Sequence, residues 1–166
     1  MTTDVQLTSL YQDLILDHYR KPRHRGTLPE ATVEVHMRNP TCGDEIRLQL
    51  LLEDGVIADL RFEGEGCSIS QASASMMTSL IRGKSLPDAL ALASRFTEMM
   101  HGDAEAATDG SLKDLRALAG VARFPVRVKC ALLGFDALQE AARRSAPQAA
   151  SPAAPPSAPP SGEVAP

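Results

Sequence analysis

The sequence has no tryptophan and few aromatic residues of any kind, which make up 4% of its 166 residues. The hydrophobic core must therefore consist mainly of Leu, Val, Ile, Ala and Met. An excess of basic residues is also lacking, because 17 Lys and Arg stand against 21 Asp and Glu. The resulting net charge of −4 at pH 7 argues against a nucleic-acid-binding protein, which needs a basic surface.

Long apolar segments are lacking as well. No apolar run of the sequence is long enough to span a bilayer, and the polar residues 1–6 do not have the apolar core of a secretory signal. We therefore expect a cytoplasmic protein whose partners include neither a membrane nor a nucleic acid.

Cysteine is scarce: the chain has three, Cys42, Cys67 and Cys130, and no CxxC pair. The missing pair argues against a zinc ribbon. An odd number of dispersed thiols in a cytoplasmic chain also argues against a disulfide framework. Metal binding, catalysis and plain burial remain as uses for these side chains.

The spacing of apolar residues predicts an α+β fold, in which a small antiparallel β-sheet of about three strands packs against several α-helices. Alternation predicts strands over residues 32–38, 46–53 and 56–62, with a tight turn at Asp54-Gly55. Helical spacing predicts helices over residues 7–19, about 68–81, 85–100, 112–118 and from 125 onward. Residues 101–110 are predicted to form a loop.

Some finer features of the helices follow from the same pattern. Ser68 or Ser70 is expected to cap the helix that follows Cys67, and Ser85 the next one. The buried stripe of the last helix is predicted to contain Val126, Cys130, Leu133 and Leu138. A basic cluster after the first helix, which includes Arg20, Lys21, Arg23 and Arg25, is either a solvated helix end or a docking patch for an acidic partner.

The composition changes after residue 145. Residues 146–166 contain seven of the twelve prolines and one charged residue, Glu163. We expect residues 1–145 to form one domain and residues 146–166 to be a disordered tail rich in Ala, Pro and Ser.

The segment Pro40–Asp44 is the first candidate for a functional site. It places the Cys42 thiol and the Asp44 carboxylate two residues apart. Gly43 between them lets the backbone bend sharply, so both side chains can face one point. A thiolate and a carboxylate at a tight bend are half of a plausible metal site.

The other two cysteines can supply the second half. Cys67 is expected near a helix N-terminus, where the helix dipole favours a thiolate, and Cys130 in the first turns of the last helix. Three thiolates and one carboxylate suit zinc or iron better than magnesium or calcium. The alternative is that the cysteines are only small buried apolar residues. His36 and His101 are more typical of an exposed strand and a loop than of ligands.

Three motifs resemble those of the U-type iron–sulfur cluster assembly proteins, the family of IscU-like, SufU-like and NifU N-terminal-like proteins. They are Asn-Pro-Thr-Cys-Gly-Asp at residues 39–44, Phe-Glu-Gly-Glu-Gly-Cys-Ser-Ile-Ser-Gln-Ala-Ser at 62–73 and Phe-Pro-Val-Arg-Val-Lys-Cys-Ala-Leu-Leu at 124–133. Residues 11–19 resemble the N-terminal helix of the same family. The resemblance extends over residues 7–143.

Within this family the chain resembles the SUF-system, SufU-like branch. The IscU-like branch has a histidine directly before the third cysteine, where this chain has Lys129. The segment between Cys67 and Cys130 is also longer here than in that branch. The resemblance implies that Cys42 is the catalytic thiol and that Arg127 binds the partner. The implied zinc ligands are Cys42, Asp44, Cys67 and Cys130.

The function implied by the resemblance is that of a zinc-dependent sulfur acceptor, or sulfurtransferase. It would take persulfide sulfur from a SufS-like cysteine desulfurase onto Cys42 and serve downstream SUF scaffold proteins. Two other functions remain open. One is a non-enzymatic scaffold or carrier that assembles a [2Fe–2S] cluster on the same cysteines. The other is a zinc-containing module that only binds a partner.

Overall fold

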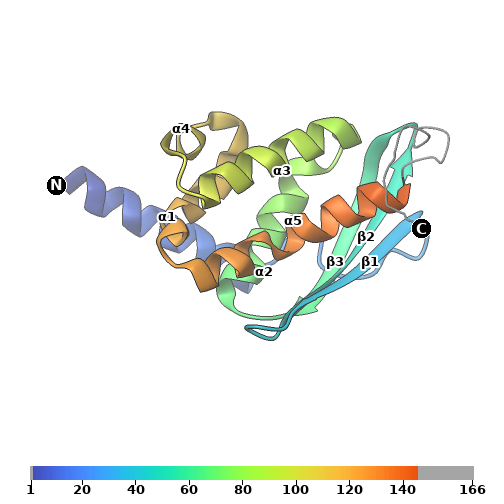
Figure 1. Cartoon of the computed structure of the whole chain (residues 1–166), viewed down its shortest axis with the longest axis horizontal. Helices are drawn as coiled ribbons and strands as arrows, with labels where there is room; N and C mark the ends of the chain where they lie inside the picture. Colours follow the sequence, from blue (N-terminus) through green and yellow to red (C-terminus); the bar gives the residue numbers. More distant parts are fainter. Residues whose placement is uncertain (1, 146–166) are drawn as a thin grey trace, which may run out of the picture.

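The computed structural model describes residues 2–145, so the expected disordered tail at 146–166 lies outside the described residues. An antiparallel sheet with the strand order β1-β2-β3 forms one layer (Figure 1). Its strands are β1 (Val33–Asn39), β2 (Asp44–Glu53) and β3 (Val56–Glu65). Asp54 and Gly55 have φ values of 53° and 78°, which the tight turn between β2 and β3 requires. The three predicted strands are confirmed.

The helices cover one face of this sheet. They are α1 (Thr2–Arg20), α2 (Ser68–Ile81), α3 (Leu86–Met100), α4 (Ala104–Ala107), the 3₁₀ segment η1 (Gly110–Arg123) and α5 (Pro125–Ser145). α5 packs along β1 and β2, and α2 packs between α1 and α5 (Figure 1). The α+β architecture predicted from the apolar spacing is therefore confirmed.

The core lies between the sheet and the helices and uses the residue types that the composition predicts. Leu48, Leu60 and Phe62 point inward from the strands and are fully buried. Met77 of α2 and Phe135 of α5 meet them from the helical layer. Among residues 2–145, no helix is long and apolar enough to cross a membrane.

Some of the finer expectations are wrong. Cys67, and not Ser68 or Ser70, is the N-cap residue of α2, because its backbone is extended and the helix begins at Ser68. The Ser70 hydroxyl donates to the Cys67 carbonyl oxygen at 3.1 Å. Val126 is 55% exposed, because the first turn of α5 projects beyond the elements on which the rest of the helix packs. Val128 is buried in its place.

The predicted loop at residues 101–110 is also partly wrong. It contains the short helix α4, whose N-cap Asp103 accepts hydrogen bonds from the backbone N–H groups of Glu105 and Ala106. A polar segment can therefore form a helical turn when an aspartate caps it and one alanine, Ala106, is fully buried.

The C-terminal end of α1 is fixed by a buried histidine. His18 is 2% exposed, and its Nδ1 lies 2.8 Å from the Ser75 hydroxyl of α2. Its Nε2 lies 3.1 Å from Asp114 of η1. The Ser75 hydroxyl also accepts a hydrogen bond from the Arg23 backbone N–H at 2.8 Å. Part of the basic segment therefore serves to join α1 to α2 and η1.

Replacing Ser75 by Ala should lower the free energy of unfolding by about 1–3 kcal/mol, because it leaves buried groups of His18 and Arg23 without their partner. Denaturant-induced unfolding measures this change. Ser79→Ala is the matched control, since Ser79 lies on the same helix and is exposed. Equal effects of the two substitutions would contradict this role for Ser75.

Candidate metal centre

Three separate parts of the fold meet at one end of the sheet (Figure 1). Cys42 lies in the loop between β1 and β2, and Asp44 is the first residue of β2. Cys67 caps the N-terminus of α2, and Cys130 lies in the second turn of α5. Residues that are up to 88 positions apart in the chain, Cys42 and Cys130, thus become neighbours.

The side chains of these residues are in direct contact. The Cys42 Sγ lies 3.1 Å from Asp44 Oδ2 and 3.2 Å from the Cys130 Sγ. The potential ligand atoms of Cys42, Asp44 and Cys130 all lie within 4.8 Å of one another. The Cys67 Sγ does not belong to this group of three, but it lies 3.8 Å from Asp44 Oδ2.

Asp44 is at the centre of these contacts. Its side chain is almost completely buried, and Oδ1 accepts a hydrogen bond from the Cys67 backbone N–H at 3.1 Å. Burial raises the pKa of Asp44, but hydrogen bonds from Cys130, Cys42 and Cys67 outweigh it and bring the pKa below its usual value. The carboxylate is therefore charged, and it lies at the N-terminus of α2, where the helix dipole stabilises an anion.

The thiols differ in their access to solvent. Cys42 is exposed, Cys67 is half-buried and Cys130 is buried. Burial and the neighbouring Asp44 carboxylate raise the pKa of Cys130. A bound metal cation reverses this effect, because it deprotonates the thiols that coordinate it. Cys42 is the thiol best placed to react with another molecule.

The donor types suit a metal ion that prefers sulfur. Cys42, Asp44 and Cys130 are close enough to share one ion, because their ligand atoms lie within 4.8 Å of one another. The Cys67 Sγ lies 3.8 Å from Asp44 Oδ2 but outside that group, so it must move toward Cys42 or Cys130 to complete a tetrahedral site. Thiolates are also the ligands that zinc and iron prefer. Magnesium and calcium prefer oxygen ligands, so the site does not suit them.

Gly66 makes room for the Asp44 carboxylate. A Cβ atom at this position would lie 2.5 Å from Asp44 Oδ1 and 2.5 Å from the Ser70 hydroxyl oxygen. Any side chain at residue 66 would therefore displace the carboxylate or the first turn of α2. The sequence shows this glycine beside Cys67, but it does not reveal the contact.

Arg127, which the resemblance connects with partner binding, lies in the first turn of α5 and is exposed. The electrostatic effect of the nearby Cys67 raises the pKa of Arg127. A groove of about 700 Å³ adjoins it and is lined by Tyr11, Ile15, Ile69 and Phe124, among others. Periodicity could not reveal this groove, because its walls come from α1, α2, η1 and α5.

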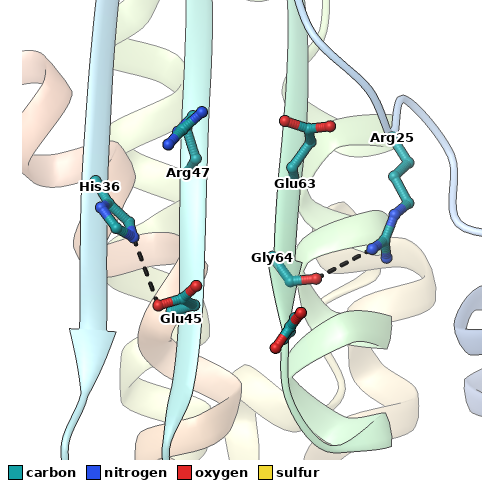
Figure 2. Close-up of a pocket in the computed structure, with 7 residues that line it drawn as sticks. Arg25, His36, Glu45, Arg47, Glu63 and Gly64 are labelled. Atoms are coloured by element: carbon teal, nitrogen blue, oxygen red, sulfur yellow. Dashed lines mark hydrogen bonds and ion pairs between the residues drawn. The ribbon is translucent and has the colours of Figure 1, made fainter.

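A second hollow, of about 290 Å³, lies on the outer face of the sheet. Figure 2 shows that His36, Glu45, Arg47 and Glu63 of the strands surround it together with Arg25. Opposite charges are paired here: His36 Nε2 lies 3.7 Å from Glu45 Oε1. These charged side chains form an exposed face and include no thiol, which confirms the prediction that His36 is an exposed strand residue.

A small α+β domain with three thiols and a buried carboxylate gathered at one end is typical of proteins that bind a metal through cysteine ligands. Within that class, the chain belongs to the family of the NifU-like N-terminal domain, whose family model matches residues 10–131. The expectation drawn from the three cysteine motifs is therefore confirmed.

Curated relatives of this chain include a protein named as a sulfurtransferase and proteins named as scaffolds. The chain is 46% identical over 144 residues to the zinc-dependent sulfurtransferase SufU of Bacillus subtilis (strain 168). This match covers 87% of this chain and 97% of that protein. It is 45% identical over 140 residues to the iron–sulfur cluster assembly scaffold protein IscU of Streptococcus pyogenes serotype M1. This match covers 84% of this chain and 87% of that protein.

Solved structures are similar as well. FiSufU of Fervidobacterium islandicum AW-1 superimposes with a TM-score of 0.72 at 33% identity, over 77% of this chain and 93% of that one. The N-terminal NifU-like protein of Brucella abortus has a TM-score of 0.72 at 26% identity, over 79% and 90%. The chain therefore shares its fold with a putative iron–sulfur cluster assembly scaffold protein for the SUF system and with a NifU-like protein.

Replacing Gly66 by Ala should weaken zinc binding by about 10–100-fold, the usual effect of disturbing a residue that supports a metal ligand, because the new Cβ displaces Asp44. Competition with a chromogenic chelator measures the affinity. Gly110→Ala is the control, since a Cβ at Gly110 meets no atom within 4 Å among the described residues. An unchanged affinity in Gly66→Ala would argue against a role for Asp44 in the centre.

Proposed function

We propose that this protein is a zinc-dependent sulfur acceptor in iron–sulfur cluster assembly and takes persulfide sulfur from a cysteine desulfurase onto Cys42. The observation behind this proposal is an exposed thiol, Cys42, that lies 3.1 Å from a buried carboxylate and 3.2 Å from a buried thiol. Such a thiol can belong to a metal centre and still be reached by another protein.

The proposed zinc ligands are Cys42, Asp44, Cys67 and Cys130. Zinc, when bound, has no redox chemistry of its own, keeps its thiol ligands deprotonated and contributes to folding. The buried Cys130 and the half-buried Cys67 are fixed by the helices on which they lie, and Asp44 by the sheet. Cys42 can therefore detach with the smallest change in the rest of the fold.

In the proposed transfer, the partner presents a cysteine persulfide. The Cys42 thiolate attacks its outer sulfur atom, a new S–S bond forms at Cys42, and the S–S bond of the partner breaks. The partner cysteine leaves as a thiolate, and the proton of the outer sulfur stays on that atom. Only a thiolate is nucleophilic enough for this exchange. Cys42 would then pass the sulfur to downstream SUF scaffold proteins.

Arg127 and the adjoining groove support a protein as the sulfur donor. The guanidinium group lies beside Cys67 and is exposed, so it can pair with an acidic or anionic group of the partner. The groove next to it presents the aromatic ring of Phe124, which is 59% exposed. An exposed aromatic ring next to an arginine is typical of protein interfaces.

A second candidate function is a scaffold that assembles a [2Fe–2S] cluster on the same cysteines. The IscU-named relative from Streptococcus pyogenes, at 45% identity, favours it. Lys129, which stands where the IscU-like branch has histidine, is exposed and precedes the buried Cys130. Lys129 cannot replace a histidine as a ligand while its amine is protonated, and this supports the acceptor function.

Cys42→Ala should abolish the increase in desulfurase turnover that the protein causes, because the acceptor sulfur is removed. Sulfide release by the desulfurase, with and without this protein, measures the effect. Thr41→Ala is the matched control, since it changes the neighbouring exposed side chain and leaves the thiol in place. Full stimulation by Cys42→Ala would exclude the proposed transfer.

Removing the metal should lower the melting temperature. A ligand present at about 1,000 times its dissociation constant adds about 4 kcal/mol to stability, and each kcal/mol shifts the melting temperature of a domain of this size by about 2–4 °C. A strong chelator should therefore lower the melting temperature by roughly 8–16 °C, and added zinc should restore it.

Metal analysis of anaerobically purified protein should give zinc, whereas iron with sulfide would support the scaffold function. Zinc with no persulfide on Cys42 would indicate a module that only binds a partner.

A further inference from the structure

Asn39 is a buried polar residue at the edge of the candidate metal centre. It is the last residue of β1, and it pairs directly with Asp44 across the ladder between β1 and β2. Both side chains point to the inward face, where Asn39 is 8% exposed and Asp44 2% exposed. Side chains that face each other in this way have Cβ atoms about 4.5–5.5 Å apart. Asn39 is therefore an immediate neighbour of the carboxylate around which the thiols gather.

Two oxygen atoms of Asn39 hold the loop that contains Cys42. The backbone oxygen accepts a hydrogen bond from the Gly43 N–H at 2.8 Å. The side-chain Oδ1 accepts one from the Thr41 N–H at 3.0 Å. These two N–H groups belong to the residues on either side of Cys42, so Asn39 fixes the position of the thiol from both directions.

The bond to Thr41 also fixes the orientation of the side-chain amide. Since Oδ1 must face the Thr41 N–H, the NH₂ group must point in the opposite direction within the amide plane. This Nδ2 atom is buried and has no hydrogen-bond partner within residues 2–145. Native proteins rarely leave a buried donor unpaired, and such a donor often marks a place where another group binds.

The chemistry of the centre limits which group can be the acceptor. The Asp44 carboxylate already accepts from the Cys67 N–H and from the thiols of Cys42 and Cys67. Another acceptor close to Asn39 in the chain is the sulfur of Cys42, which lies in the loop that the two Asn39 oxygen atoms hold. Metal-bound ligands are commonly held and tuned by hydrogen bonds of this kind from neighbouring residues.

We propose that Asn39 is a positioning residue for Cys42. Its oxygen atoms set the position of the loop, and its NH₂ group donates a hydrogen bond to the Cys42 sulfur when that sulfur is anionic, either as a metal-bound thiolate or as a persulfide. This inference rests on the proposed function, since only there does Cys42 have anionic sulfur. Neither the three cysteine motifs nor their spacing assigns a role to this asparagine.

Two substitutions separate the oxygen of Asn39 from its NH₂ group. In Asn39→Ser, the hydroxyl can still accept from the Thr41 N–H, but the amide donor is lost. In Asn39→Ala, both are lost. If the NH₂ donor of Asn39 matters, Asn39→Ser should behave like Asn39→Ala. If only the contact with the Thr41 N–H matters, Asn39→Ser should behave like the wild type. Thr41→Ala, which keeps the backbone N–H, is the control for changes in the loop.

The test uses the full chain loaded with Co²⁺ in place of zinc, since cobalt bound to thiolates gives a charge-transfer absorption band. We expect Asn39→Ser to shift this band and to weaken Co²⁺ binding in chelator competition by about 10–100-fold. The melting temperature of the metal-free Asn39→Ser protein should stay close to that of the wild type. A purely structural role for Asn39 would move the melting temperature and leave the band unchanged.

The outcomes distinguish this inference from the function on which it rests. If the wild-type protein shows no thiolate–cobalt band, the metal centre itself is wrong, and the role of Asn39 falls with it. If the wild type shows the band and Asn39→Ser matches it in position and affinity, the NH₂ group does not donate to the Cys42 sulfur, and this inference alone is overturned.

Discussion

The contacts of the Asp44 carboxylate are the constraint on which the site depends. One oxygen accepts the backbone N–H at the start of α2, and the other contacts the thiols of Cys42 and Cys67. A single buried anion thus joins the sheet, the hairpin loop and a helix N-terminus. Burying a carboxylate is costly unless its hydrogen bonds are satisfied. The segments that supply its hydrogen-bond donors must therefore stay next to it. Gly66 is needed for the same reason, because only a residue without Cβ leaves space for it.

Around this anion, the thiols are arranged from buried to exposed. Cys130 is enclosed by the core, Cys67 lies half-buried at a helix start, and Cys42 is exposed on a short loop. Such an order suits a centre in which two thiols stay in place and one is available to a partner. The loop itself is not slack: Gly43 has a φ of 76°, and Asn39 accepts hydrogen bonds from both residues next to Cys42. The exposure of the Cys42 thiol is therefore combined with a defined position.

Much of the fold could be predicted from the sequence. Apolar and polar residues alternate along β1, β2 and β3 because one face of the sheet is buried. This alternation predicted the position of each strand to within a few residues. The errors have a common cause. The Ser68 cap, the exposure of Val126 and the helix α4 depend on which neighbouring element is close enough to compete for a hydrogen bond or to cover a side chain. Local spacing contains no information about such neighbours.

By itself, the sequence determined the chemistry that is available: three thiols without a CxxC pair, a carboxylate two residues from the first thiol, and the motifs of the NifU-like family. It also determined the α+β class, because periodicity reports which side of each element is apolar. Only the tertiary structure decided which groups meet. The distance between Cys42 and Cys130 and the contact of Gly66 with Asp44 arise where segments far apart in the chain pack together, since contacts of this kind are fixed by the geometry of the whole core.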